Sequence, residues 1–282
     1  MVTVEQVLSA STWSALVLPR TEDTLRRLRR QFHPDVFPDP RATAVFTRLE
    51  VLFGAPEFQL RTFAGQRVQG SNAIEWTPKP GFEDLVGVAD AALRTLARSN
   101  NPRFFTSRQD VASTRPGMRV NYGEAVERWW FLSAFDALDS RTAVWVAKRL
   151  AAAITTAGEA GWIHGDIHPG TVVLMPAEHG LKLDGWWSAV RSGEKLAVAP
   201  SAKTPPRYLN GAEADPRLSV GQVAATLLAV TDADHLLQAV FARHSVSPGE
   251  PRAFFDDVDL AASELYGKRA WSPLADPTSE PI

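Results

Sequence analysis

Two aspartates in the second half of the chain have the setting of residues that handle protons and metal ions. Asp166 follows a histidine and a glycine in a short loop, and Asp184 stands at the end of an apolar run further along. An aspartate of the first kind can accept the proton of a hydroxyl group, and one of the second kind can hold a divalent cation. Phosphoryl transfer uses both functions, together with a second metal ligand and a cation on the phosphates. Which chemistry the two aspartates serve depends on the residues around them.

The pattern around these aspartates resembles the catalytic core of protein kinases. A helical stretch precedes the loop with His164-Gly165-Asp166, a short apolar strand follows, and a second strand ends at Asp184. Kinases have His-Arg-Asp in that loop, an Asn shortly after it, and Asp-Phe-Gly after the second strand. The His-Gly-Asp form is closer to that of kinase-like small-molecule phosphotransferases. The resemblance covers about residues 58–266, and it implies that Asp166 has the position of the base and Asp184 that of the metal-loop aspartate.

Other positions depart from the kinase pattern. Thr171 stands in place of the second metal ligand, Asn, and its neutral hydroxyl is a poorer ligand for magnesium. The metal loop reads Asp184-Gly185-Trp186, which moves the glycine by one place. Glu75 stands in place of the phosphate-binding lysine, where a carboxylate repels triphosphate. Lys79 is the only lysine among the first 147 residues, and the prolines on both sides of it disfavour the middle of a strand.

Three further kinase positions are also changed. The glutamate that pairs with the lysine is replaced by Ala89, with Asp90 next to it. The glutamate that anchors the activation segment is replaced by Arg207. Pro216 stands where an aspartate would pin the catalytic loop, with Asp215 adjacent. Together these departures predict a pseudokinase, a kinase-like domain without catalysis and without a resident cofactor.

Two alternatives to the pseudokinase stay open. The first is an atypical ATP-dependent phosphotransferase in which Asp166 and Asp184 act with ATP and one magnesium ion. The second is a metal site, because His164, Asp166 and His168 alternate along an extended segment and His179 could supply a fourth ligand. For His164 itself a purely structural role is also open, in which it packs in the interior and hydrogen-bonds backbone carbonyl groups, as the histidine of this loop does in kinases.

The amino-terminal residues have the pattern of a helical hairpin. The first helix of the hairpin carries an apolar stripe made of Leu25, Leu28 and Phe32. It must end before Pro34, which has no amide hydrogen to donate. A second stripe with helical spacing predicts a helix that packs antiparallel to the first; its members are Ala42, Val45, Phe46, Leu49, Leu52 and Phe53. An earlier helix is expected over Val4–Leu16, with Trp13 and Leu16 as packing residues.

The loop at the tip of this hairpin resembles that of the J-domain of DnaJ-type co-chaperones. In that family a basic helix ends in Tyr-His-Pro-Asp or a close variant, and this chain reads Phe32-His33-Pro34-Asp35. The preceding helix carries four arginines largely off its apolar stripe: Arg26, Arg27, Arg29 and Arg30. The resemblance implies that the arginines meet an acidic face of a DnaK-type ATPase, while His33 and Asp35 relay the signal and Pro34 holds the turn. The family's fourth helix has no counterpart, and an ordinary hairpin with a proline turn is the alternative.

Composition narrows the class of protein. The chain has no cysteine, which excludes disulfide scaffolds, thiol catalysis and iron–sulfur clusters. A formal net charge of −2 gives no support for nucleic-acid binding. The chain has no run of about 20 apolar residues, the length that a membrane span needs, and no basic start followed by an apolar run. These features predict a cytoplasmic protein without a membrane partner.

We therefore expect an α+β chain with two parts. A small helical hairpin J-domain, residues 1–56, precedes a reduced two-lobed protein-kinase-like domain. The first lobe and hinge span residues 57–141, and the second lobe spans residues 142–282. Strand-like runs open the first lobe at Phe58–Phe63, Gln66–Val68 and Ala73–Trp76. This order resembles that of some bacterial and phage DnaJ-like proteins, and it predicts a co-chaperone or adaptor whose kinase-like part binds an unknown protein partner.

Overall fold

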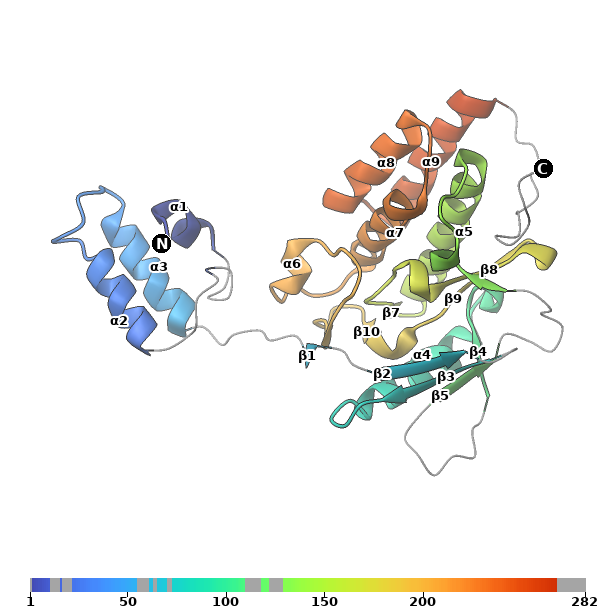
Figure 1. Cartoon of the computed structure of the whole chain (residues 1–282), viewed down its shortest axis with the longest axis horizontal. Coiled ribbons are helices and arrows are strands. Elements are labelled where there is room, and N and C mark those ends of the chain that lie inside the picture. The colour runs from blue at the N-terminus through green and yellow to red at the C-terminus, as the bar shows by residue number, and fades with distance from the viewer. Residues whose placement is uncertain are drawn as a thin grey trace. The chain divides into compact units, whose positions relative to one another are not determined.

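The structure is a computed structural model of the whole chain. It describes residues 2–10, 16, 22–54, 61–62, 65–69, 73–109, 118–121 and 129–267. The chain divides into two compact units, Met1–Gln59 (unit 1) and Leu60–Ile282 (unit 2) (Figure 1). Each unit has its own hydrophobic core. Among the described residues, no helix combines the length and the apolar character that crossing a membrane requires.

The described part of unit 1 contains the α-helices α1 (Val4–Ser9), α2 (Glu22–Gln31) and α3 (Ala42–Gly54). The predicted apolar stripes of α2 and α3 meet in one core, where Leu25, Leu28 and Leu49 are at most 1% exposed. Helix α2 ends before Pro34, as the sequence predicted. The two longer helices lie side by side and the loop that carries the His-Pro-Asp triplet joins them (Figure 1).

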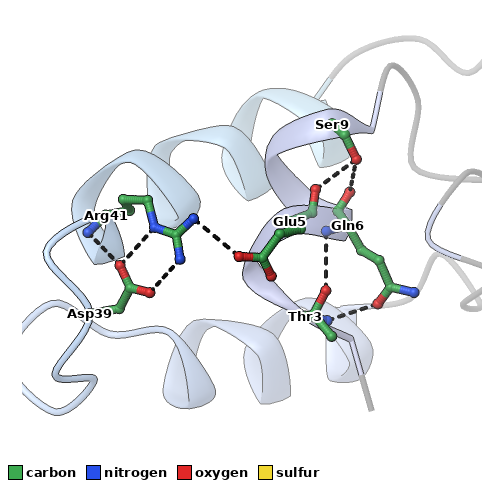
Figure 2. Close-up of polar contacts among 6 residues, drawn as sticks. All are labelled: Thr3, Glu5, Gln6, Ser9, Asp39 and Arg41. Atoms are coloured by element: carbon green, nitrogen blue, oxygen red, sulfur yellow. Dashed lines mark hydrogen bonds and ion pairs between the residues drawn. The ribbon is translucent and has the colours of Figure 1, made fainter.

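Helix α1 is shorter than the predicted Val4–Leu16. It ends at Ser9, because Ala10 has an extended backbone with φ −64° and ψ 131°. The Ser9 hydroxyl donates to the Glu5 carbonyl oxygen at 2.6 Å, a local bond that competes with helix continuation (Figure 2). Leu16 is 6% exposed and belongs to the core of unit 1, as predicted. Trp13 lies outside the described residues.

A capping box fixes the start of α1. The Thr3 hydroxyl accepts a hydrogen bond from the Gln6 amide at 3.2 Å, and the Gln6 side chain accepts one from the Thr3 amide at 2.8 Å (Figure 2). The two bonds satisfy amide groups that have no partner within the first turn of a helix.

Unit 2 begins with an antiparallel sheet and one helix. The sheet has the strand order β2 (Gly65–Gln69), β3 (Ala73–Pro78), β5 (Met118–Asn121) and β4 (Ser107–Gln109). Helix α4 (Asp84–Leu96) connects β3 to β4 by way of the short turn η2 (Pro102–Phe104). Strands β2 and β3 confirm two of the three predicted runs.

The first predicted run is described only in part, and that part lies outside this sheet. Its described part, β1 (Arg61–Thr62), pairs in parallel with β11 (Val198–Ala199). Val198 is 2% exposed and belongs to the main core of unit 2, so β1 adds a strand to the edge of a buried segment. Phe58, Gln59, Leu60 and Phe63 of the predicted run lie outside the described residues.

The rest of unit 2 is mainly helical, as predicted from Ala143 onward. The main helices lie side by side (Figure 1); they are α5 (Ser140–Glu159), α7 (Pro216–Val230), α8 (His235–Val246) and α9 (Pro251–Tyr266). Short strands flank α5; they are β6 (Trp130–Phe131), β8 (Val172–Met175) and β9 (Gly180–Leu183) in one sheet, and β7 (Trp162–Ile163) with β10 (Val190–Arg191) in another. Single helical turns complete the unit: η3 (Leu132–Ala134), η4 (Pro169–Thr171), η5 (Pro176–Glu178), η6 (Trp186–Ser188) and α6 (Pro206–Leu209).

Candidate functional site

The predicted catalytic loop lies between β7 and β8 and is buried. His164 is 1% exposed and Asp166 is 4% exposed. Gly165 between them has φ +85°, and a Cβ atom there would lie 2.2 Å from the carbonyl oxygen of Ser188. Only glycine fits this conformation and this approach. The neighbouring loop therefore requires glycine between His164 and Asp166 and excludes the arginine that protein kinases have at this position.

Both carboxylate oxygens of Asp166 accept hydrogen bonds from other residues of the chain. Ser201 donates its hydroxyl proton to Oδ2 at 2.5 Å, and the backbone amide of Ala202 donates to Oδ1 at 2.8 Å. In phosphoryl transfer, the hydroxyl that attacks phosphorus gives its proton to a carboxylate of this kind. Ser201 thus holds the place at Asp166 that an acceptor hydroxyl would take.

His164 joins the two aspartate loops through backbone groups. Its Nε2 donates to the Asp184 carbonyl oxygen at 2.6 Å, and its Nδ1 accepts from the Asp166 amide at 3.3 Å. Burial lowers the pKa of His164 to about 4, so the ring is neutral at pH 7. This is the structural role that the sequence offered for the residue. The Nδ1 of His168 accepts from the Gly170 amide at 3.1 Å, and among the described residues no three metal-ligating side chains converge, so the geometry does not favour the metal-site alternative.

Thr171 belongs to the turn that follows the catalytic loop. Its hydroxyl accepts from the His168 amide at 3.0 Å and donates to the His168 carbonyl oxygen at 2.9 Å. Gly185 has φ +88°, and a Cβ atom there would lie 2.6 Å from the Thr171 methyl carbon. The threonine that replaces asparagine and the displaced glycine therefore pack against each other. Asp184 is 1% exposed, and its amide donates to the Thr171 carbonyl oxygen at 2.8 Å.

Strand β3 brings a tryptophan to the core beside α4. Trp76 is 1% exposed and stacks on Trp187, with ring centroids 5.0 Å apart and ring planes 6° apart. Ala89 of α4 is fully buried in the same cluster. Active kinases have a lysine on this strand and a glutamate on this helix, and the two form an ion pair that positions the phosphates. In this chain, the buried side chains described where β3 meets α4 include Trp76 and Ala89, which are aromatic and apolar.

Glu75 precedes Trp76 on β3, and its side chain lies outside what the structure describes. The assignment of Glu75 to the place of lysine therefore stays a prediction. Asp90, next to Ala89, pairs with Arg94 one turn further along α4 at 3.0 Å. This pairing agrees with the expectation that alanine, and not the neighbouring carboxylate, faces the core.

The loop that carries His164 and Asp166 is held by Gln222, a residue that was not predicted from the sequence. Gln222 of α7 is fully buried; it accepts from the Ile167 amide at 3.0 Å and donates to the Gly165 carbonyl at 2.8 Å and to the Thr204 hydroxyl at 2.9 Å. One amide side chain thus ties the catalytic loop to the segment that carries Ser201. The signal in the sequence is a glutamine within a run of apolar and small residues, because a buried amide needs polar partners.

Contacts of Arg207 and Tyr208 with Asp215 tie α6 to the start of α7. Arg207, in place of glutamate, pairs with Asp215 at 3.3 Å and also bonds the hydroxyl of Tyr208. Tyr208 donates to Asp215 at 2.6 Å, and Asp215 caps α7 by accepting from the Arg217 amide at 2.9 Å. Pro216 is the first residue of α7, where its missing amide hydrogen costs nothing.

In unit 1, the predicted chaperone-binding residues lie in the loop between α2 and α3. The side chains of His33 and Asp35 are 45% and 85% exposed, and the Asp35 amide donates to the His33 Nδ1 at 3.3 Å. The His33 ring packs edge-on against Phe46 of α3, with centroids 5.7 Å apart. Pro34 between them is exposed.

The four predicted arginines have different roles in the structure. Arg29 forms a two-pronged bond to Glu50 of α3 at 2.6 and 2.5 Å, so it holds the two helices together. Arg26 pairs with an aspartate on its own helix at 3.1 Å. Arg27 and Arg30 are exposed. The bond to Glu50 is a structural role for Arg29 that the sequence did not indicate.

Arg41 fastens the far end of this loop. Its guanidinium contacts Asp39 at 2.8 Å and Glu5 of α1 at 3.1 Å (Figure 2). Hydrogen bonds from Arg41 lower the pKa of Asp39 to about 2, so this carboxylate stays charged at neutral pH. The α3 end of the loop is therefore tied to α1, while the triplet at its α2 end stays accessible.

Solved structures that resemble this chain are protein kinase domains. The Mycobacterium tuberculosis PknI kinase domain matches with a TM-score of 0.51 and 15% identity, over 74% of this chain and 99% of that domain. A double mutant and a single mutant of that domain match with TM-scores of 0.51 and 0.50 and identities of 16% and 17%; the matches cover 74% of this chain in both cases and 94% and 100% of those chains. No family model and no curated protein matches the sequence. Such low identity shows the fold alone: the chain contains a protein-kinase fold.

Proposed function

We propose that this chain is a co-chaperone or adaptor of the cytoplasm. Unit 1 recruits a DnaK-type chaperone ATPase through His33-Pro34-Asp35 and stimulates it. Unit 2 is a pseudokinase that holds a protein partner, transfers no phosphate and needs neither ATP nor magnesium. The two units together bring the chaperone to that partner.

The observation that carries this proposal is the accessible triplet beside a cationic helix. His33 and Asp35 are exposed at the α2 end of a loop whose α3 end is fastened to α1 by Arg41. Arg27 and Arg30 are exposed on the helix that leads into the loop. Cations on such a surface speed the encounter with an acidic partner and fix its orientation.

Three contacts in unit 2 support a role without catalysis. Ser201 covers the base position at Asp166. Trp76 on β3 stacks on Trp187 beside α4, and the lysine and glutamate that active kinases pair on this strand and helix have no described counterpart there. Thr171, in place of the second metal ligand, directs its hydroxyl to backbone groups.

The test is single-turnover ATP hydrolysis by a DnaK-type chaperone, measured with and without the full chain. The wild-type chain should stimulate hydrolysis and His33→Gln should abolish the effect. His235→Gln is the matched control, because this histidine is 84% exposed on α8 of unit 2. Asp166→Asn should also leave stimulation intact. The proposal fails if the wild-type chain does not stimulate the chaperone, or if His33→Gln stimulates it equally well.

A further inference from the structure

A polar cavity lies between the end of α4 and the end of α5 in unit 2. Its volume is about 410 Å³, within the range of about 300–1,000 Å³ that is usual for small-molecule sites. Its lining includes Arg94, Arg98, Ser99 and Asn100 from α4 and the turn after it, and Thr156 and Glu159 from the last turn of α5. The lining is polar and charged, which favours a polar ligand.

The core of unit 2 holds both sides of this cavity in place. Leu96, the last residue of α4, is fully buried, and Ala157 of α5 is 3% exposed; both belong to the main core of the unit. Thr156, which lines the cavity, is also buried. Packing therefore fixes the two helix ends, and the cavity is formed in the free chain.

The α4 side of the cavity carries two cations. Arg94 and Arg98 are four residues apart, a spacing that places them on the same face of a helical segment. Arg94 donates to Asp90 through its Nε at 3.1 and 3.0 Å, which uses one of the five N–H groups of a guanidinium. Arg98 forms no ion pair with any residue that the structure describes. The guanidinium groups therefore have N–H groups left to donate to a carboxylate in the cavity.

The α5 side of the cavity carries the opposite charge. Glu159 is exposed at the end of α5, and over the described ranges its carboxylate pairs with no cation, Arg98 included. The hydroxyl groups of Thr156 and Ser99 donate to carbonyl oxygens of their own helices at 2.9 and 2.6 Å, so towards the cavity these oxygens act as acceptors. The carboxyl end of a helix adds partial negative charge. This side therefore suits an ammonium group.

We propose that this cavity is a binding site for a small zwitterion of dipeptide size. Its carboxylate contacts Arg94 and Arg98, and its ammonium group contacts Glu159. A ligand with one sign of charge pairs with one side of the cavity and is repelled by the other, whereas a zwitterion pairs with both. An extended dipeptide spans about 7 Å, and Asn100 offers a donor and an acceptor to the amide between its ends. This site is separate from the recruitment of a chaperone and does not depend on it.

The experiment is calorimetric titration of three compounds into the full chain at pH 7: alanyl-alanine, its N-acetyl derivative and its carboxyamide. Alanyl-alanine should bind one-to-one, and each blocked form should bind at least about tenfold more weakly, because it lacks one charged hydrogen-bonding end. Arg98→Gln should remove most of the preference over the carboxyamide and keep the preference over the N-acetyl form. Glu159→Gln should do the reverse.

Two exposed residues of α9 provide the matched controls: Arg252→Gln and Glu264→Gln should keep both preferences. Arg98 and Glu159 are exposed as well, so their variants should melt at the temperature of the wild type. The proposal is overturned if alanyl-alanine does not bind, if either blocked form binds as tightly as the free dipeptide, or if Arg98→Gln and Glu159→Gln keep both preferences.

Discussion

Ser201 donates its hydroxyl proton to the buried carboxylate of Asp166 at 2.5 Å, across 35 positions of the chain. The amide of Ala202 completes the contact, and Gln222 holds Thr204 of the same segment. Residues 198–199 of this segment pair with β1, the first described strand of unit 2. The segment is thus fixed at three points, and the middle one occupies both oxygens of the Asp166 carboxylate.

Removing the hydroxyl of Ser201 should loosen this segment. A hydrogen bond to a charged group contributes about 1.5–3 kcal/mol, so Ser201→Ala should increase local opening by roughly tenfold or more. Amide hydrogen exchange over residues 198–204 measures the effect. Ser201→Thr keeps a hydroxyl and should exchange like the wild type. Unchanged exchange in Ser201→Ala would mean that the contact does not hold the segment.

The stacked tryptophans should be coupled in stability. Trp76→Ala and Trp187→Ala should each lower the free energy of unfolding of unit 2 by about 3–5 kcal/mol, because each leaves a large cavity. The double mutant should cost less than the sum by about 0.5–1.5 kcal/mol, the usual value for an aromatic pair. Urea unfolding of the four proteins gives this coupling energy. Additive losses would show that the stack contributes nothing beyond burial.

The buried His164 should make unit 2 sensitive to acid. Its pKa is about 4 in the fold, whereas a histidine in an unfolded chain has its ordinary pKa of 6.5, so the unfolded chain binds the proton more readily. Its contribution is complete above pH 6.5 and is lost as the pH falls towards 4, a total of about 3 kcal/mol. Urea unfolding at pH 7 and pH 5 measures this loss. His164→Gln should be less stable at pH 7 but should show a smaller loss between the two pH values, whereas equal losses in both proteins would contradict the assignment.

Gln222 should be more important for stability than its neutral side chain implies. Gln222→Ala leaves the Ile167 amide, the Gly165 carbonyl and the Thr204 hydroxyl without this partner, at about 1–3 kcal/mol for each buried group. We expect a loss of about 3 kcal/mol or more in the free energy of unfolding. Gln238→Ala on α8 is the control, because this glutamine is exposed and its loss should change stability by less than about 0.5 kcal/mol. A similar small effect for Gln222→Ala would refute the role.

Parts of the fold that depend on residues close together in the chain were predictable from the sequence. The apolar stripes of α2 and α3 have helical spacing, and Pro34 sets the limit of α2. The order of helix, loop and two strands around Asp166 and Asp184 indicated the kinase fold that the solved structures share. Helix α1 was predicted too long because the Ser9 side chain bonds back to the Glu5 carbonyl, a competition that apolar spacing does not reveal.

Features that depend on distant contacts were not predictable. Nothing near Ser201 in the sequence shows that it meets Asp166, and nothing near β1 shows that it pairs with β11 instead of β2. On β3, placing a side chain depends on register to a single residue, because neighbouring residues face opposite sides of a strand. The sequence drew attention to the charge of Glu75, whereas the described side chain in the core is Trp76.

The most direct test of the account is calorimetric titration of ATP with magnesium into the full chain, followed by incubation with radiolabelled ATP. The stack of Trp76 on Trp187 and the covered Asp166 predict no binding heat and no transfer of label. One-to-one binding that is lost in Asp184→Ala, with label transfer that is lost in Asp166→Asn, would contradict the account and establish an ATP-dependent phosphotransferase.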